Sequence, residues 1–364
     1  MAAERIIRLI KRTPLFPHLA LFGNAVRLRP ELLELNLSRE RTVELFKQYV
    51  EVVELETVRF CNRRCSWCPN SFIDRISTKK FMPDGIWQDI VSKLSSIDYA
   101  GTFVWSRYSE ATADPSLSQK IRQVRGAMPR AWIAVISNGD YLTEKLLLEM
   151  AESGLNRLCL DAYIDYEGGY SVEKATNAVA TMAQRLKCVL GITREGMSAV
   201  EARCFHPRAP SVWITIASIN LSVAENFYNR SGLVKGPFPE GFVRTSPCSR
   251  PFRNVTIDWD GCVMPCCDTM SDAPQHRGYV VTKLKEGEVD VIDAYRMLAA
   301  WRRKLCGFQV GNAPCRNCNI SCYPSSALSR GVYGMLGGVA MHSPRFVSPL
   351  LYRISGGHRQ RYRP

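Results

Sequence analysis

The segment "RFCNRRCSWCPNSF" (59–72) places three cysteines, Cys61, Cys65 and Cys68, within eight residues. On a helix they would share one face and could pack in a core, but they follow a strand-like stretch and Pro69 comes directly after them. Disulfide bonds cannot use an odd group of three, and a structural zinc site normally takes four ligands, of which no fourth lies nearby. Three thiolates therefore favour a [4Fe–4S] cluster with one iron left unligated by the protein.

The fourteen cysteines of the chain are clustered, with groups at 61–68, 248–267 and 306–322. Clustering of this kind suggests ligands. Because the N-terminal segment has no convincing signal peptide, we expect no disulfide framework and a reducing, cytoplasmic setting. No apolar run reaches the length of a membrane span. The cysteines outside the groups are interpreted as small buried hydrophobes: Cys159, Cys188 and Cys204.

The balance of 46% apolar and 23% charged residues is typical of a globular protein. The net charge of +14 is concentrated toward the two ends of the chain. No groove motif with interleaved aromatic residues supports a nucleic-acid partner. The segment 5–12 could form a basic amphipathic helix resting on a membrane surface, or a helix that caps the main domain.

Strand-like stretches alternate with helical patterns over about the first 235 residues. We expect strands at 52–60, 99–106, 131–139, 155–162 and 211–220, with helices at 84–97, 115–128, 142–154 and 171–187. This alternation predicts parallel βα units, and hence an α/β barrel or open sheet. Ligands of such sheets bind at the carboxyl ends of the strands. The cysteine group and the segments "SRYSE", "SNG" and "LDA" all fall at expected strand ends.

The segment "CNRRCSWC" resembles the CxxxCxΦC signature of the radical S-adenosylmethionine (SAM) superfamily, with Trp67 in the hydrophobic position. The resemblance implies an α/β fold with a partial (β/α)6 TIM-like barrel. It implies that SAM chelates the open iron of a cluster held by Cys61, Cys65 and Cys68. An external donor such as flavodoxin or ferredoxin would supply the electron that cleaves SAM to methionine and a 5′-deoxyadenosyl radical, which abstracts a substrate hydrogen.

The resemblance also suggests residues that bind SAM. "RYSEATADP" stands where the family has its GGEP-like motif, so Tyr108, Ser109 and Glu110 are candidates for holding the SAM amino group. A carboxylate at this place complements an ammonium group. The segment "ISNGD" offers Ser137 and Asn138 toward the sulfonium or ribose of SAM.

Weaker candidates end two further expected strands: Asp161, Ser218 and Asn220. A plain turn or capping role stays open for every residue suggested here as binding SAM, apart from Glu110.

The region 248–322 resembles the SPASM/twitch extension, through the pattern C-x12-G-x4-C followed by "PCRNC". The resemblance implies one auxiliary Fe–S cluster, [4Fe–4S] in type, ligated by Cys248, Cys266, Cys315 and Cys318. Four further cysteines could substitute for one of these ligands: Cys262, Cys267, Cys306 and Cys322. Bare C-x2-C pairs also bind zinc, so that alternative stays open. Asp268 follows the "PCC" segment and is a candidate general base beside the cluster, or a turn cap.

Together these features predict a basic N-terminal helical extension (1–50), a radical SAM barrel (51–240), an auxiliary cluster domain (245–325) and a basic tail (326–364). The leading hypothesis is a radical SAM enzyme that oxidises or epimerises a small polar metabolite, such as a sugar or aminocyclitol. An enzyme that matures a peptide or protein side chain is the alternative within the family. A zinc-stapled basic binding protein is the alternative outside it.

Overall fold

The computed structural model describes residues 28–164, 169–223, 226–236, 241–308, 311–320, 327–328, 331–332 and 335. The expected amphipathic helix at 5–12, most of the basic tail and Cys322 lie outside these ranges. Of the N-terminal extension, the described part contains a 3-10 helix, η1 (Pro30–Leu33), and the helix α3 (Arg39–Tyr49). No helix among the described residues is long and apolar enough to cross a membrane.

A sheet of ten strands forms the centre of the structure, in the order β12-β11-β10-β1-β4-β5-β6-β9-β8-β7. Its strands are β1 (Val52–Leu55), β4 (Thr102–Trp105), β5 (Trp132–Ser137), β6 (Arg157–Asp161), β7 (Val189–Arg194), β8 (Ala199–Phe205), β9 (Trp213–Ile219), β10 (Asn254–Ile257), β11 (Cys262–Met264) and β12 (Thr282–Lys283). The consecutive neighbours β10, β1, β4, β5, β6 and β9 are parallel. Antiparallel strands lie at both edges.

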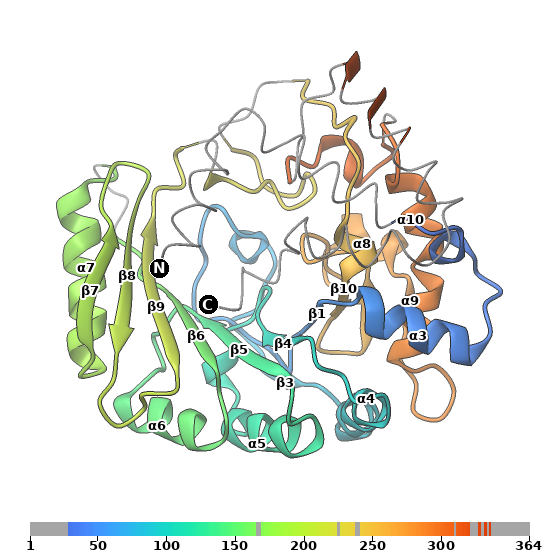
Figure 1. The fold of residues 1–364 in the computed structure, drawn as a ribbon. Helices are drawn as coiled ribbons and strands as arrows, with labels where there is room; N and C mark the ends of the chain where they lie inside the picture. Colours follow the sequence, from blue (N-terminus) through green and yellow to red (C-terminus); the bar gives the residue numbers. More distant parts are fainter. Residues whose placement is uncertain are drawn as a thin grey trace.

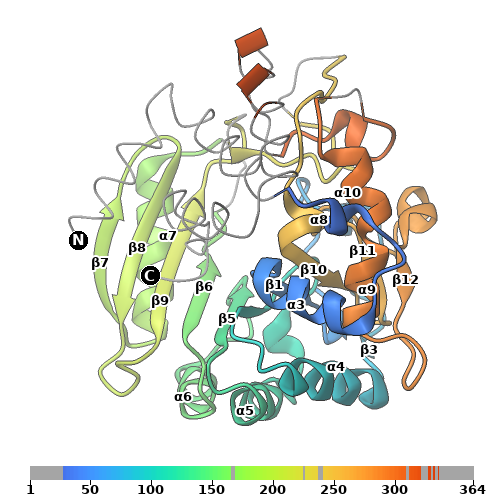
Figure 2. The ribbon, with the colours of Figure 1, turned by 45° about the vertical axis from the view of Figure 1, so that its right-hand side comes forward.

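This mostly parallel sheet with helices between its strands confirms the expected α/β fold class. The helices are α4 (Asp84–Ser96), α5 (Leu117–Ala127), α6 (Glu144–Glu152), α7 (Val172–Arg185), α8 (Arg250–Arg253), α9 (Val291–Met297) and α10 (Ala299–Leu305). In Figures 1 and 2 the sheet curves, and α4, α5 and α6 lie side by side along its outer face.

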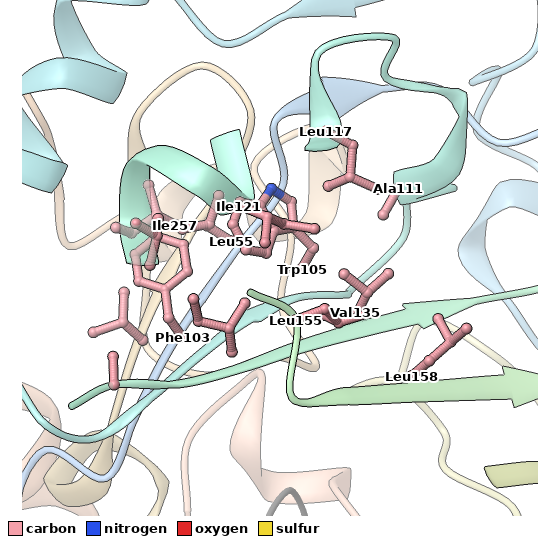
Figure 3. Close-up of a cluster of buried hydrophobic side chains, with 14 of the residues drawn as sticks. Leu55, Phe103, Trp105, Ala111, Leu117, Ile121, Val135, Leu155, Leu158 and Ile257 are labelled. Atoms are coloured by element: carbon pink, nitrogen blue, oxygen red, sulfur yellow. The ribbon is translucent and has the colours of Figure 1, made fainter. Parts of the chain in front are cut away.

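Apolar residues at helical spacing explain why these helices cover the sheet. In α5, for example, Leu117, Ile121 and Val124 are all fully buried, because residues three and four apart share one face of a helix. They pack into one large cluster with sheet residues such as Leu55 and Val135 (Figure 3). Burial of this outer face leaves the carboxyl ends of the parallel strands available for a site.

Two features of the sheet differ from the expectation. The stretch expected as one strand, 52–60, is divided into β1 and the short β2 (Val58–Arg59), which pairs with β3 (Lys80–Phe81) in a separate two-stranded sheet. The hairpin of β7 and β8 was not predicted. It interrupts the βα alternation between α7 and β9, and five of the six β7 residues are exposed, which hides the strand pattern.

The region expected as an auxiliary domain also takes part in the central sheet. Strand β10 pairs in parallel with β1, with Val52 opposite Asn254 and Leu55 opposite Ile257. Strand β11 adds to it in antiparallel fashion. The division of the chain near residues 240–245 stays a prediction, but the sheet joins the two regions.

Candidate functional site

The first cysteine loop lies directly after β2, at the carboxyl end of the parallel strands. The backbone N–H of Cys61 donates to the carbonyl of Arg75 at 3.1 Å, and that of Cys68 donates to the carbonyl of Cys65 at 2.9 Å. The loop ends in a 3-10 helix, η2 (Pro69–Ser71). These bonds curl the loop so that its three cysteines stay partly accessible.

The three thiols of this loop lie close enough to influence one another. Burial raises the pKa of Cys61 to about 11 and that of Cys65 to about 12, and each of these shifts includes repulsion from the Cys68 thiolate. Burial also raises the pKa of Cys68. Three partly accessible thiols in one loop are a donor set that fits an iron–sulfur cluster. Nowhere in the described residues are three or more His, Cys, Asp or Glu side chains gathered to hold a single metal ion.

The loop is fastened to the end of β5 through Asn62 and Arg63. The Asn138 side-chain amide donates to Asn62 Oδ1 at 2.9 Å, and its nitrogen lies 3.9 Å from Cys61 Sγ. Asp140 accepts from Asn62 at 2.6 Å and from two nitrogens of Arg63 at 2.6 Å each. The structure therefore brings the predicted residue Asn138 to the first cysteine loop.

Glycine is needed where this strand turns. Gly139 has a φ of 75°, and a Cβ atom there would lie 3.0 Å from the end of the Met182 side chain. The positive φ is the region that glycine enters at little cost. The turn lets Asn138 and Asp140 project toward the cysteine loop.

Glu110 is buried, and bonds from the protein surround its carboxylate. Oε1 accepts from the backbone N–H and the hydroxyl of Thr112 and from Ser137 Oγ at 2.6 Å, whereas Oε2 accepts from the backbone N–H of Asn138 at 2.8 Å. Glu110 thus joins the end of β4 to the end of β5. The structure brings Glu110, Ser137 and Asn138 together, as the sequence predicted, and their contact with SAM stays a proposal.

Tyr108, Ser109 and Trp67 differ in where they point. The Tyr108 side chain is buried and packs with Met270, Ala273 and Cys68, so it faces the second cysteine region instead of Glu110. Ser109 is half-buried. Trp67 is half-buried, and its ring lies 5.6 Å from that of Tyr163.

The weaker candidates lie at the ends of β6 and β9. Asp161 ends β6, and its charge contributes to the raised pKa of Cys65. Asn220 bonds to Met197 and Ser222 in a turn, which matches the turn role left open for it. Ser218 is buried in β9.

The second cysteine set lines one cavity. The four cysteines expected as auxiliary ligands lie in its wall: Cys248, Cys266, Cys315 and Cys318. Arg244, Arg250 and Asp268 also line the cavity. They come from segments up to about 70 residues apart in sequence, so the fold has gathered them. A cavity walled by four thiols has the donor set of a [4Fe–4S] cluster.

Burial and mutual repulsion also mark this set as a group of neighbours. Burial raises the pKa of Cys315 to about 12 and that of Cys318 to about 11, with contributions from Cys248 in both cases. It raises the pKa of Cys266 well above the usual range, with contributions from Cys315 and Cys318. Ligation therefore requires the loss of protons that the bare thiols hold firmly.

The cysteines left over contact other groups. Cys262 is buried, and its thiol donates to Asp260 at 3.2 Å. Cys306 donates to the carbonyl of Arg303 at 3.4 Å. Cys267 does not line the cavity, and its sulfur accepts from Arg250 at 3.3 Å. The geometry favours the expected four ligands over these three.

Asp268 lines the same cavity, and its side chain is 1% exposed. Its Oδ1 lies 3.3 Å from Arg230 Nη1, and its Oδ2 accepts from Cys267 at 3.6 Å. The sequence analysis did not identify Arg230 as a functional residue. It also missed Arg107, which contacts Asp258, and Arg75, which lies near Asp272. Their partners lie far away along the chain, so no local pattern could have identified them.

Comparison with known proteins defines the class. The family described as "Radical SAM superfamily" matches residues 55–204, and the family described as "Iron-sulfur cluster-binding domain" (SPASM) matches residues 248–319. The chain therefore carries a radical SAM domain and a SPASM domain, which imply [4Fe–4S] clusters and SAM as cofactors. Because these domains define an enzyme class, the alternative hypothesis of a zinc-stapled binding protein is dropped.

Individual relatives match only part of this chain or have low sequence identity to it. An S-adenosyl-L-methionine-dependent 2-deoxy-scyllo-inosamine dehydrogenase from Niallia circulans is 33% identical over 106 residues, which span 29% of this chain and 42% of that protein. The solved structure of BtrN in complex with AdoMet and 2-DOIA has a TM-score of 0.51 at 19% identity, covering 76% of this chain and 96% of BtrN. This likeness shows the fold.

A weaker likeness is to Streptococcus suis SuiB bound to the precursor peptide SuiA, with a TM-score of 0.36 at 12% identity over 78% of this chain and 74% of SuiB. A score at this level supports no inference about the substrate.

Proposed function

We propose that this chain is a radical SAM dehydrogenase that oxidises a hydroxyl-bearing carbon of a small polar metabolite, sugar-like or aminocyclitol-like. The observation that carries the proposal is the 33% identity to a dehydrogenase of an aminocyclitol over 106 residues. Oxidation is favoured over epimerisation because the relative is named as a dehydrogenase. The cavity walled by four cysteines supports the same choice, since oxidation leaves one electron to be accepted near the substrate.

When bound, the cluster and SAM supply the chemistry that removes one hydrogen atom from the substrate. The protein holds this chemistry in place with Cys61, Cys65 and Cys68. Glu110, Ser137 and Asn138 form a rigid rim next to that loop, because their hydrogen bonds join the ends of two neighbouring strands. Because these side chains are already fixed, they can orient a bound molecule without a further loss of side-chain freedom when it binds.

The oxidation of an alcohol carbon also releases the hydroxyl proton and one electron. We assign Asp268 as the group that receives the proton, because it lines the auxiliary cavity beside Cys266 and is oriented by Arg230. The auxiliary cysteine set would hold the group that receives the electron. Balance is then complete: a hydrogen atom, a proton and an electron leave the substrate, and a carbonyl group forms.

The test uses anaerobically prepared protein with both clusters, SAM and a flavodoxin or ferredoxin. A panel of aminocyclitols and sugars deuterated at carbon is added, and deuterium in 5′-deoxyadenosine and the carbonyl product are measured by mass spectrometry. We expect deuterium transfer with an aminocyclitol, and none in the Cys65→Ala variant. Transfer only from an added peptide would replace this proposal with the peptide-modifying alternative.

A further inference from the structure

Among the described residues, five non-glycine residues have a positive φ. Two of them, Asp98 and Lys187, follow the ends of α4 and α7, where a left-handed residue is ordinary. The other three follow no such helix end: Arg107 at 81°, Arg230 at 49° and Ser231 at 54°. Such conformations carry backbone strain and persist where the surrounding structure imposes them. Arg230 and Ser231 are the central residues of a turn closed by the bond from the Gly232 N–H to the Asn229 carbonyl at 3.0 Å, so it is the strain at Arg107 that calls for a structural reason.

Arg107 and Arg230 face the same aromatic ring. The guanidinium carbon of Arg107 lies 5.5 Å from the centre of the Tyr108 ring, and that of Arg230 lies 5.8 Å from it. Arg75, which follows the first cysteine loop in the chain, lies 6.0 Å from the same ring. Cations at about 6 Å are attracted by the electron-rich face of an aromatic ring. Tyr108 is 3% exposed and the side chains of Arg75 and Arg107 are fully buried, so water weakens these two contacts little, whereas the Arg230 side chain is 30% exposed.

Each of the three arginines pairs with a different aspartate, and all three aspartates lie in one segment, 258–272. Arg107 contacts Asp258 and also donates to the carbonyl of Thr269 at 2.8 Å. Arg230 lies 3.3 Å from Asp268, and Arg75, whose hydrogen-bonded partner is Glu56 at 2.8 Å, also lies 3.1 Å from Asp272. The segment carries Cys266. It is therefore held at three places by arginines from three other parts of the chain.

The first cysteine loop is held at the same junction. The carbonyl of Arg75 accepts from the backbone N–H of Cys61, and Tyr108 packs against Cys68. On the other side, Asp268 lines the cavity of the auxiliary cysteines together with Cys266. Tyr108 and its charged neighbours thus contact both cysteine sets.

We propose that this junction fixes the position of the auxiliary cysteine set relative to the first cysteine loop. The Tyr108 junction consists of Tyr108, Arg75–Asp272, Arg107–Asp258 and Arg230–Asp268. Its members are positioning residues, except that Asp268 also receives the proton in the proposed function, on which the inference rests. Electron transfer between centres falls steeply with distance, so an enzyme with two clusters depends on their spacing. This role for Tyr108 also differs from the SAM contact expected from the sequence.

Net stability alone does not account for the arrangement. Buried ion pairs contribute little compared with apolar side chains of similar volume, because taking two charges out of water costs nearly as much as their attraction returns. The side chains of Arg107 and Asp258 are both fully buried. Directional pairs of this kind specify one geometry, which is what a fixed spacing requires.

The experiment compares holoenzyme variants by iron content and by EPR of the two reduced clusters, whose spin–spin interaction depends on their separation. Tyr108→Leu removes the ring, and Arg107→Met removes one cation. Tyr108→Phe keeps the ring. Arg130→Met is the matched control, because the Arg130–Asp98 pair is exposed and lies outside the junction. We expect wild-type iron in all four variants, a shifted interaction in the first two, and a wild-type interaction in Tyr108→Phe and Arg130→Met.

A wild-type interaction in both Tyr108→Leu and Arg107→Met would overturn the junction while leaving the proposed function intact. If those two variants lose iron, Arg107→Lys decides: it keeps the charge but replaces the guanidinium whose Nη2 contacts both Asp258 and the carbonyl of Thr269, and an unchanged interaction there would overturn the proposal. Wild-type protein that holds no second cluster would refute the proposed function and the junction together.

Discussion

Ser137 donates a hydrogen bond of 2.6 Å to Glu110, which joins the carboxyl ends of β5 and β4. The same carboxylate accepts from the backbone N–H of Asn138 at 2.8 Å. Glu110 therefore holds the rim of the site together from within, besides any contact that it makes with SAM.

Replacing Glu110 with glutamine tests this role. An amide nitrogen in place of one oxygen would face N–H or O–H donors, so a buried bond is lost and a donor is left without a partner, which costs about 1–3 kcal/mol. We expect Glu110→Gln to lower the free energy of unfolding of the cofactor-free chain by this amount in urea titrations. The control Glu288→Gln removes an exposed charge and should stay within about 0.5 kcal/mol of the wild type. Equal stability of the two variants would contradict the role.

The two cysteine sets should hold iron independently. Cys315→Ala removes a cysteine of the auxiliary cavity, so we expect it to lose about four irons per chain, one [4Fe–4S] cluster, and to retain the cluster of the first loop. Cys65→Ala should show the reverse. Iron and sulfide analysis with EPR checks both. Cys188→Ala is the control, since that residue lines neither site; loss of iron in this variant would show that the assay reports folding.

Asp268→Asn should separate SAM cleavage from product formation. If Asp268 receives the substrate proton, the asparagine variant still forms 5′-deoxyadenosine, but the carbonyl product falls by about 10²-fold or more. The ratio of the two products, measured by mass spectrometry at equal iron content, is the readout. Asp260→Asn is the control, because Asp260 contacts Cys262 and Lys283 instead of the auxiliary cavity. A proportional fall of both products would argue against the proton-accepting role.

Asp114 should give the fold a specific sensitivity to acid. Burial opposes ionisation of this carboxyl, but bonds from Lys120 at 2.7 Å, from Ser116 and from Thr57 outweigh it and lower its pKa. A pKa that is lower in the folded than in the unfolded state stabilises the fold above the unfolded value of about 3.9 and loses this contribution as the pH falls through the folded value.

We therefore expect Asp114→Asn to be less stable than the wild type at pH 7, with a difference that shrinks as the pH falls below about 4. Chemical denaturation of the cofactor-free chain at several pH values measures it. Asp98→Asn, which alters an exposed pair, serves as the control. A difference that is constant with pH would contradict the assignment.

Local sequence patterns predicted the parts of the structure that depend on local physics. The spacing of Cys61, Cys65 and Cys68 identified the first loop, and alternating apolar patterns located most of the parallel strands and their helices. The same patterns placed Glu110, Ser137 and Asn138 at strand ends, and these residues do meet. The four auxiliary cysteines were chosen by resemblance, and they line one cavity.

The rest depends on contacts between distant parts of the chain. Arg107 lies 151 residues from its partner Asp258, and no periodicity signals such a pair. Tyr108 was assigned by its place in a motif, but its direction is set by three guanidinium groups from different segments. In the hairpin of β7 and β8, β7 is the outermost strand of the sheet, and five of its six residues are exposed, so it lacks the apolar alternation that marks a strand.

The pairing of β10 with β1 has a consequence for biosynthesis. Val52 pairs with Asn254, so about 200 residues are translated between the two strands. At about 5–20 residues per second, β1 would wait roughly 10–40 s on the ribosome for its neighbour. Until then one side of β1 offers unpaired backbone groups, which are a template for aggregation. Nascent chains that stop before residue 254 should therefore depend on chaperones, and the segment carrying the auxiliary cysteines is also the one whose arrival completes the parallel sheet.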